Sequence, residues 1–266
     1  PRRRRALRRA GTEGPFHGGV RWVRRSTSKD FLNWTPFVDI DTGETPTEHL
    51  YTNACVRYER APGTYVMFPS RFVIDRTPDP DWEHGEGVND IVFMSSRDGL
   101  HFDRSFKEAF VRPGLDQRNW HERGIYMEVG ILQTSPEEMS LYGMDHKGTP
   151  SMRILRYGLR TDGFVSVNAG YKGGEFMTKP FVFVGNELEL NYSTSAVGSV
   201  KVEIQDDRGN ALPGFTLDEC PEMFADLIEG KVAWEGGGDV SSLAGKPVRL
   251  RFTLMDADLY AFKFNE

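Results

Sequence analysis

A seven-residue motif recurs along the chain and constrains its fold more than any other feature. Residues 28–34 read Ser-Lys-Asp-Phe-Leu-Asn-Trp, and residues 96–102 read Ser-Arg-Asp-Gly-Leu-His-Phe. A weaker copy, Arg-Thr-Asp-Gly-Phe, occupies residues 160–164, so the central aspartates recur after 68 and then 64 residues. Recurrence at this spacing predicts repeated supersecondary units in tandem.

Each copy of the motif predicts a tight turn between two strands. The apolar run 91–94 before the second copy is typical of a strand, and Asp-Gly then suits a turn because glycine adopts a positive φ without steric cost. The aromatic residue that follows begins the next strand. Because Asp30, Asp98 and Asp162 recur together with the turn, we interpret them as turn formers rather than as catalytic groups.

The segments between the copies predict about four short strands in each unit. Strand patterns cover residues 54–58, 65–68, 130–132, 139–142 and 153–157. Four-stranded units in tandem are typical of propeller blades, but residues 20–165 hold only about two and a half units, whereas a closed propeller has about four to eight blades. We therefore predict a partial β-propeller of two to three blades over 20–165, in a chain that is a fragment or whose missing blades come from another chain.

The pattern changes after residue 165. Leu188, Leu190 and Tyr192 alternate with polar residues, and so do the apolar residues of 200–204 and 248–254. Period-two patterning predicts strands with one buried and one solvated face, so residues 166–266 are expected to form a jelly-roll-like antiparallel β-sandwich. A hairpin turn is predicted at 206–210, and a short helix at 218–229 with Asp218 as its N-cap. The predicted fold class is thus all-β in both parts.

Charge is unevenly distributed along the sequence. The net charge is -6, yet residues 1–25 contain nine arginines, so the rest of the chain is clearly acidic. An acidic body excludes nucleic acid as the main partner, because phosphate binding requires a basic surface. The Arg-rich segment 1–19 is predicted to be unstructured, and a nucleic-acid-binding arm is the alternative interpretation.

The remaining composition predicts no cofactor, no metal site and no membrane span. The two cysteines, Cys55 and Cys220, do not form a disulfide framework, and the histidines show no metal-ligand spacing. No apolar run approaches the ~20 residues that a spanning helix needs. The chain shows no secretion signal, although a longer precursor could carry one, and the sequence predicts neither a compartment nor an oligomeric state.

The motif of residues 96–102 resembles the blade motif of the five-bladed propeller glycosidases, the group that contains glycoside hydrolase families 32, 43, 62 and 68. Residues 160–167, 193–199, 202–206, 243–252 and 256–260 are similar to a large group of uncharacterised bacterial proteins described as glycosyl hydrolase-like, with a propeller before a sandwich. The resemblance covers about residues 20–266 and implies a glycan or oligosaccharide as partner. It also implies catalytic carboxylates on inner strands, and the first-blade carboxylate has no counterpart here.

Glycoside hydrolysis needs two carboxyl groups, of which one protonates the leaving oxygen. The predicted inner strands lie near 48–56 and 123–131. Glu128, in an apolar strand, is a candidate channel acid, with an arginine partner or a solvated face as the alternative. Glu122 is a candidate at the rim beside Trp120, whose ring would stack on a sugar. Asp90 precedes the strand 91–94 and is either a third catalytic carboxylate or a turn cap.

Five further residues are candidates for substrate binding. His49 and Asn53 share one face of an inner strand, and His49 is either a hydroxyl ligand or a hydrogen-bonded loop histidine. Arg71 offers a guanidinium fork for carboxylates or diols, with an interblade salt bridge as the alternative. Arg123 follows Glu122, and His146 ends another predicted strand with either role open. These residues predict glycoside hydrolase-like chemistry. A non-catalytic carbohydrate-binding module with an exposed Trp234 or Tyr171, or a purely structural role for the sandwich, are the alternatives.

Overall fold

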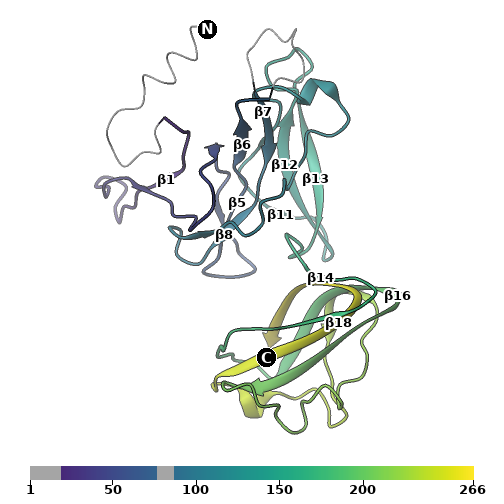
Figure 1. The fold of residues 1–266 in the computed structure, drawn as a ribbon. Coiled ribbons are helices and arrows are strands. Elements are labelled where there is room, and N and C mark those ends of the chain that lie inside the picture. The colour runs from purple at the N-terminus through teal and green to yellow at the C-terminus, as the bar shows by residue number, and fades with distance from the viewer. Residues whose placement is uncertain (1–18, 77–86) are drawn as a thin grey trace. The chain divides into compact units, whose positions relative to one another are not determined.

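The computed structural model describes residues 19–76 and 87–266, and its regular structure is almost entirely β (Figure 1). The predicted all-β class is therefore confirmed. Within the described residues the helical elements are two single 3-10 turns, η1 (Gln117–Asn119) and η2 (Ser241–Leu243). The predicted N-terminal segment 1–19 lies, apart from Gly19, outside the described residues.

The chain divides into two compact units. Unit 1 comprises Pro1–Thr134 and Met139–Gly158, and unit 2 comprises Ser135–Glu138 and Leu159–Glu266. The sequence placed the boundary between residues 165 and 166, so the observed division falls slightly earlier in the chain. Each unit is described by itself below.

Unit 1 consists of short antiparallel strands. A two-stranded sheet joins β1 (Arg24–Arg25) to β2 (Val38–Asp39). A three-stranded sheet has the order β3 (His49–Tyr51), β6 (Ser70–Val73), β7 (Val88–Ile91). A four-stranded sheet has the order β4 (Val56–Arg57), β5 (Tyr65–Met67), β8 (Met94–Ser96), β9 (Phe102–Asp103). In the last sheet, β12 (Glu138–Asp145) pairs with β10 (Tyr126–Met127), β11 (Leu132–Gln133) and β13 (Arg153–Arg160).

The sheet of β3, β6 and β7 and the sheet of β4, β5, β8 and β9 are built from the same stretches of chain. β5 leads into β6, and β7 leads into β8, with two residues between the strands in each case. Pro69 lies at the first break, where it has no N–H to donate to a ladder. Backbone bonds nevertheless continue across it, because Phe68 N donates to Asn53 O at 2.9 Å and Val92 N donates to Pro69 O at 3.0 Å. The result is a kinked four-strand meander, whose interpretation as a propeller blade stays a prediction.

The core of unit 1 is formed where these sheets meet. Seven buried side chains from β1 through β9 and the adjoining loops pack into one cluster: Val23, Ile40, Leu50, Met67, Val92, Met94 and Phe102. A second group is aromatic, with the rings of Phe68, Phe93 and Phe110 between 5.3 and 5.7 Å apart. Rings at these separations gain from tilted and stacked contacts in addition to area burial.

The recurring motif forms the same turn at both of its complete copies. The Ser96 hydroxyl oxygen accepts from the N–H groups of Asp98 and Gly99, and one Asp98 carboxylate oxygen accepts from those of Leu100 and His101. Ser28 and Asp30 accept equivalent bonds in the first copy. These bonds lower the pKa of Asp30 and, with His101, that of Asp98. The interpretation of these two aspartates as turn formers is confirmed.

Unit 2 is one five-stranded antiparallel sheet with the order β14 (Val167–Ala169), β18 (Val248–Asn265), β16 (Glu187–Asp206), β17 (Asp226–Lys231), and β15 (Gly174–Met177) also pairs with β18. The long, curved β16 and β18 run side by side through the unit (Figure 1). Both halves of β16 face one core, since Leu188, Leu190, Val202 and Ile204 are all wholly buried in the same cluster. A single curled sheet thus encloses the core that the sequence assigned to two sheets.

A bulge allows β16 to change direction. The pairing register between β16 and β18 shifts between Thr194 and Ser199. Gly198 lies in this shift, and a Cβ atom there would stand 2.4 Å from the carbonyl oxygen of Asp256. Only glycine permits so close an approach of two backbones.

The helix predicted at 218–229 is wrong, whereas the hairpin turn at 206–210 is confirmed. Residues 217–219 form turns, Met223 makes an antiparallel bridge to Val200, and β17 begins at Asp226. The Glu219 carboxylate accepts from the N–H groups of Gly214 and Thr216, which stabilises a loop in place of a helix. Pro221 also lacks the N–H that a helix would use.

Candidate functional site

The structure brings most of the predicted site residues into three polar clusters of unit 1. The first contains Arg71 and Asp90, the second contains Arg123 with Glu122, and the third surrounds His146. Glu128 and Asn53 lie outside these clusters. The roles predicted for these residues stay predictions, and the geometry below shows what each side chain is placed to do.

The first cluster is an ion-pair network of Glu48, Arg71, Asp90 and Arg104. Arg71 on β6 lies directly opposite Asp90 on β7 and donates to both carboxylate oxygens, from Nε at 2.8 Å and from Nη2 at 2.5 Å. Its Nη1 donates to Glu48 at 3.1 Å. The bond to Asp90 is the main cause that raises the pKa of Arg71. Because all three nitrogens of the Arg71 guanidinium already donate to Asp90 or Glu48, few of its N–H groups are left for a ligand, and we interpret the network as stabilising the sheet.

Arg104 completes this network, and sequence reasoning missed it. Its side chain is 1% exposed, its Nε donates to Glu48 Oε2 at 3.3 Å, and its Nη2 donates to the backbone oxygen of Lys107 at 3.3 Å. Burial lowers the pKa of Arg104, and Nη1 has no hydrogen-bond partner. Nothing in the sequence around Arg104, which follows Phe102 and Asp103, predicts that its side chain is buried.

The second cluster, which we call the tyrosine–arginine cluster, contains Arg21, Tyr51, Arg123, Tyr126 and Lys147. Tyr51 ends β3 and Tyr126 begins β10, and their ring centroids are 5.8 Å apart. The Arg21 guanidinium lies 5.7 Å from the Tyr51 centroid, and Lys147 Nζ lies 4.3 Å from the Tyr126 centroid. Both distances are in the range of cation–π attraction.

Burial raises the pKa of Tyr126 to about 12, although the positive charges of Arg123 and Arg21 oppose the shift. The Tyr126 hydroxyl therefore stays protonated at ordinary pH and is able to donate a hydrogen bond. Tyr51 is 46% exposed, whereas Tyr126 is almost wholly buried. The cluster therefore combines one accessible ring with cationic groups. Two of these groups, Arg21 and Lys147, are more than a hundred residues apart in the chain.

Buried polar side chains hold Arg123 in place. Its backbone N–H donates to Asn89 Oδ1 at 2.6 Å, Asn89 Nδ2 donates to Ser70 Oγ at 2.8 Å, and Ser70 Oγ donates to the Ile125 carbonyl at 3.3 Å. Asn89 and Ser70 are buried, and neither was singled out by sequence analysis. This relay links β6 and β7 to the loop before β10.

Non-glycine residues with positive φ lie close to the cluster in the chain. Thr52 follows Tyr51 with φ of 48°, Arg123 has φ of 66°, and His146 precedes Lys147 with φ of 53°. Such backbone conformations cost of order 1–3 kcal/mol each and are concentrated at functional sites. Three of them beside one group of side chains mark it as the candidate site.

His49 lies beside the same cluster and is half-buried. Its Nδ1 accepts from the Arg21 backbone N–H at 3.3 Å, and its ring packs edge-on against Phe72. Burial, followed by the charge of Arg21, lowers the pKa of His49, although Asp75 acts in the opposite direction. The ring of His49, which lies on β3 and not in a loop, therefore supports the position of Arg21.

Glu122 and Trp120 lie on the loop before β10. Glu122 Oε1 accepts from Arg123 Nη2 at 2.7 Å, and its side chain is 13% exposed. Trp120 is 37% exposed, and its indole N–H donates to the Gly114 carbonyl at 2.7 Å. Both stay available as rim residues, although the structure gives no contact between Trp120 and the tyrosine–arginine cluster.

The third cluster surrounds His146, which is wholly buried. Its Nε2 lies 2.9 Å from Asp116 Oδ2 and 3.5 Å from Asp145 Oδ2, and its Nδ1 lies 3.2 Å from Ser151 Oγ. Its backbone N–H donates to Asn119 Oδ1 at 3.0 Å. The imidazole thus joins η1 to the end of β12, and as placed it faces the protein interior.

Glu128 and Asn53 are placed differently. Glu128 is half-buried after β10, where its backbone N–H donates to the Tyr142 carbonyl at 2.8 Å and its carboxylate has no ion pair among the described residues. Asn53 is exposed, and its Oδ1 accepts from the Cys55 N–H at 2.9 Å in a turn between β3 and β4. Sequence periodicity could not separate these two environments.

In unit 2 the expectation of an exposed Trp234 is wrong. Trp234 is 3% exposed, its indole N–H donates to the Val202 carbonyl at 3.0 Å, and its ring packs edge-on against Phe215. It belongs to the core and not to a sugar-binding surface. Tyr171 is 74% exposed and stays the aromatic candidate of this unit.

Among residues 19–76 and 87–266, no group of three or more His, Cys, Asp and Glu side chains is placed to hold a metal ion. Within the same residues no helix has the length and apolar character needed to cross a membrane.

Comparisons with known proteins return one structural likeness. No protein-family model matches the chain, and no curated protein matches it either. A crystal structure of a glycoside hydrolase family 43 arabinoxylan arabinofuranohydrolase from Bacillus subtilis, in complex with cellotetraose, is similar to it with a TM-score of 0.32 and 11% sequence identity. The match covers 96% of this chain and 62% of that structure, so the chain spans less than two thirds of its length.

Proposed function

We propose that unit 1 binds a glycan at the tyrosine–arginine cluster, as part of a glycoside hydrolase-like protein. The observation that carries this proposal is the grouping of the accessible Tyr51 ring with hydrogen-bonding and cationic groups from three separate segments. The C–H face of a sugar ring is apolar and packs on an aromatic face, while its hydroxyls need donors and acceptors at the edge. This cluster offers both kinds of contact.

The sequence supports the proposal independently. The blade-like motif resembles that of the propeller glycosidases, in which the catalytic carboxylates come from the inner strands that line the central channel. β3 and β10, which supply Tyr51 and Tyr126, are the strands that the sequence assigned to the inner position of two consecutive units. We propose that these units are blades of a larger propeller, in line with the two to three blades expected from the sequence.

Binding is tested with an exposed aromatic residue from each unit. Tyr51→Ala removes a tyrosine that is 46% exposed in unit 1, and Tyr171→Ala removes one that is 74% exposed in unit 2. A panel of plant and microbial oligosaccharides is measured by isothermal titration calorimetry. We expect Tyr51→Ala to weaken binding about 10-fold or more, which is ~1.4 kcal/mol, and Tyr171→Ala to bind as the unsubstituted chain does. Loss in Tyr171→Ala alone would move the site to unit 2 and favour the module hypothesis.

Hydrolysis is a second candidate function, and the placement of Glu122 favours it. This largely buried carboxylate pairs with Arg123 of the cluster, beside the proposed sugar site. Release of reducing sugar that is lost in Glu122→Gln, with unchanged oligosaccharide affinity, would support it. Unchanged turnover in Glu122→Gln would exclude Glu122 as the acid and leave Glu128 as the next carboxylate to replace.

A further inference from the structure

We infer that the tyrosine–arginine cluster selects an acidic sugar, a uronate, whose carboxylate pairs with Arg21 and Lys147. This inference rests on the proposed function, because it names the class of glycan that the same site binds. It starts from the charges that surround the two tyrosine rings.

Among the residues that the structure describes, positive charge exceeds negative charge at this site. Arg21, Arg123 and Lys147 are the cations, whereas the carboxylates that act here are Glu122, which pairs with Arg123, and Asp75, whose charge acts on His49. The whole chain carries a net charge of -6, so this local excess runs against the overall composition. A positive group in an acidic protein attracts an anionic ligand selectively.

Arg21 and Lys147 have no carboxylate partner among the described residues. Arg21 contacts the rings of Tyr51 and Phe72, at 5.7 and 4.9 Å from their centroids, and Lys147 contacts the ring of Tyr126 at 4.3 Å. Both cations are half-buried, so part of their hydration has already been lost. A ligand carboxylate would supply the counter-charge that the described part of the chain does not supply here.

The chemistry of the groups suits a carboxylate on a sugar ring. A guanidinium fork bonds the two oxygens of a planar carboxylate in a bidentate manner, and a lysine ammonium adds a point charge. The accessible Tyr51 ring offers the surface on which the sugar lies. A neutral sugar would use the ring but leave two partly desolvated cations without a counter-ion.

Two matched pairs of ligands separate charge from shape. Tetragalacturonate is compared with its full methyl ester, and glucuronic-acid-substituted xylotriose is compared with xylotetraose. Binding to the full chain is measured by calorimetry at about 20 mM and about 200 mM NaCl, because screening weakens charge pairing. We expect at least one acid to bind about 10-fold or more tightly than its neutral counterpart, with an advantage that shrinks at the higher salt concentration.

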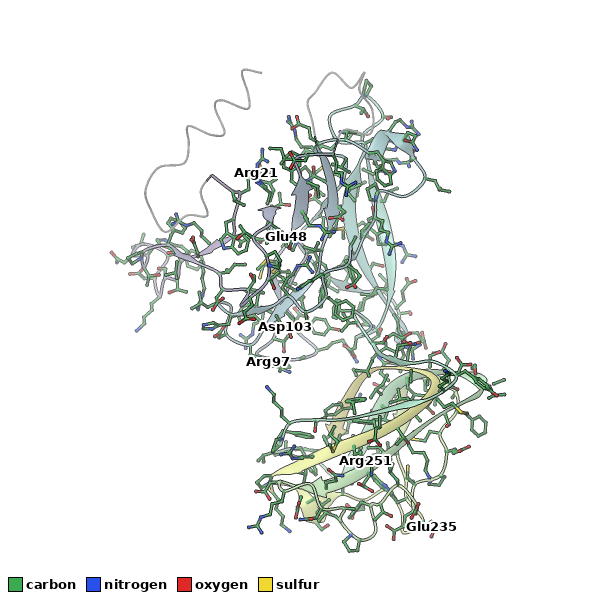
Figure 2. All side chains as sticks on the ribbon, in the orientation of Figure 1. Arg21, Glu48, Arg97, Asp103, Glu235 and Arg251 are labelled. Carbon is green, nitrogen blue, oxygen red and sulfur yellow. The ribbon has the colours of Figure 1, made fainter. Side chains whose placement is uncertain are left out.

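Three variants with the same change of charge locate the effect. Arg21→Gln and Lys147→Gln are expected to reduce the affinity for the acid about 10- to 150-fold, the range for one charge-assisted hydrogen bond, and to leave the neutral ligand unaffected. Arg97→Gln is the control, because Arg97 is exposed and lies at the opposite end of unit 1 from Arg21 (Figure 2). Circular dichroism and thermal melts confirm that each variant is folded.

The outcomes separate the two claims. Equal binding of acids and neutral counterparts would overturn the inference and leave the proposed function standing. Binding of none of the four would overturn the inference, and only the further failure of the whole oligosaccharide panel would overturn the proposed function as well. A preference for the acid that survives Arg21→Gln and Lys147→Gln would place the acidic subsite elsewhere and overturn the inference. A sulfated oligosaccharide that binds where no uronate does would also overturn it.

Discussion

The ion-pair network around Arg71 should be essential for the stability of unit 1. Arg71, Asp90 and Glu48 have side chains that are only 20%, 16% and 19% exposed, so each charge depends on its partners more than a surface charge does. Replacing Arg71 with Met keeps an unbranched apolar stem but leaves Asp90 without its bidentate partner. Glu48 would retain Arg104.

The magnitude follows from this burial. Removing one partner of a fully buried ion pair costs about 3–5 kcal/mol. Because a fifth of each side chain is still exposed and solvent screens part of the charge, we expect about 2–3 kcal/mol for Arg71→Met. With a slope of about 1–3 kcal/mol per molar urea, this loss lowers the unfolding midpoint by about 1–2 M.

Urea unfolding followed by tryptophan fluorescence measures the effect, since Trp22, Trp34, Trp82 and Trp120 all belong to unit 1. Arg118→Met is the control, because Arg118 pairs with Asp116 but is 56% exposed, and we expect no measurable shift. The double variant with Arg71→Met and Asp90→Val should recover part of the loss, because it removes both charges and places a β-branched residue in β7. A midpoint for Arg71→Met equal to that of Arg118→Met would refute the reasoning.

Two further predictions concern His49 and the bulge in β16. Burial lowers the pKa of His49 in the folded chain below its ordinary value of 6.5. Below pH 6.5 the imidazole therefore binds a proton more readily in the unfolded chain than in the folded chain, so the free energy of unfolding should fall as the pH decreases through 6.5. Thermal melts of the unsubstituted chain and of His49→Gln across this range should diverge below pH 6.5, and parallel profiles would contradict the assignment. In unit 2, Gly198→Ala places a Cβ atom against the Asp256 carbonyl and should lower the free energy of unfolding by about 1–3 kcal/mol. Gly170→Ala is the control, because open space surrounds that position. Both are measured by chemical unfolding followed by circular dichroism, and equal unfolding midpoints would show that the bulge relaxes.

In unit 2, β16 and β18 were predictable because their pattern has a single physical cause, whereas β14, β15 and β17 were not predicted. Leu188, Leu190 and Tyr192 alternate with polar residues, and all three are buried on the same face of β16. Alternation identifies such strands and their apolar face, but the face expected to be solvated is partly buried, since Glu189, Asn191, Glu203 and Gln205 are at most 6% exposed. Alternation also does not show where a strand bends. The bulge before Ser199 was therefore invisible, and a single curled sheet has the same sequence pattern as two separate sheets.

The false helix at 218–229 has a comparable explanation. Asp218 is a good N-cap and the residues after it include helix formers, so local preference favoured a helix. Tertiary contacts override that preference, because Val200 pairs with Met223 through two backbone hydrogen bonds and the Glu219 carboxylate serves loop N–H groups. Propensity is a weak guide wherever a neighbouring strand offers the backbone a ladder.

The candidate site was predictable only in part. Glu122, Arg123 and His49 were singled out because polar residues next to inner strands are suited to sugar chemistry, and all three lie at or beside the cluster. Arg21 and Lys147 were not, because nothing near them in the sequence distinguishes them from other surface cations. Their role depends on contacts with Tyr51 and Tyr126, which are made by folding and leave no local pattern.

Repetition within the chain helps to separate structural residues from functional ones. Ser28 with Asp30 and Ser96 with Asp98 accept the same set of backbone hydrogen bonds, so the repeated carboxylates are already used within their turns. Even the left-handed backbone is shared, with φ of 62° at Phe31 and 72° at Gly99, although only glycine adopts it without strain. A feature that recurs in each copy of the motif serves what the copies have in common, which is folding. A single binding site needs residues that do not recur, and this argument directs the search for function away from the motif aspartates and toward Arg21, Arg123 and Lys147.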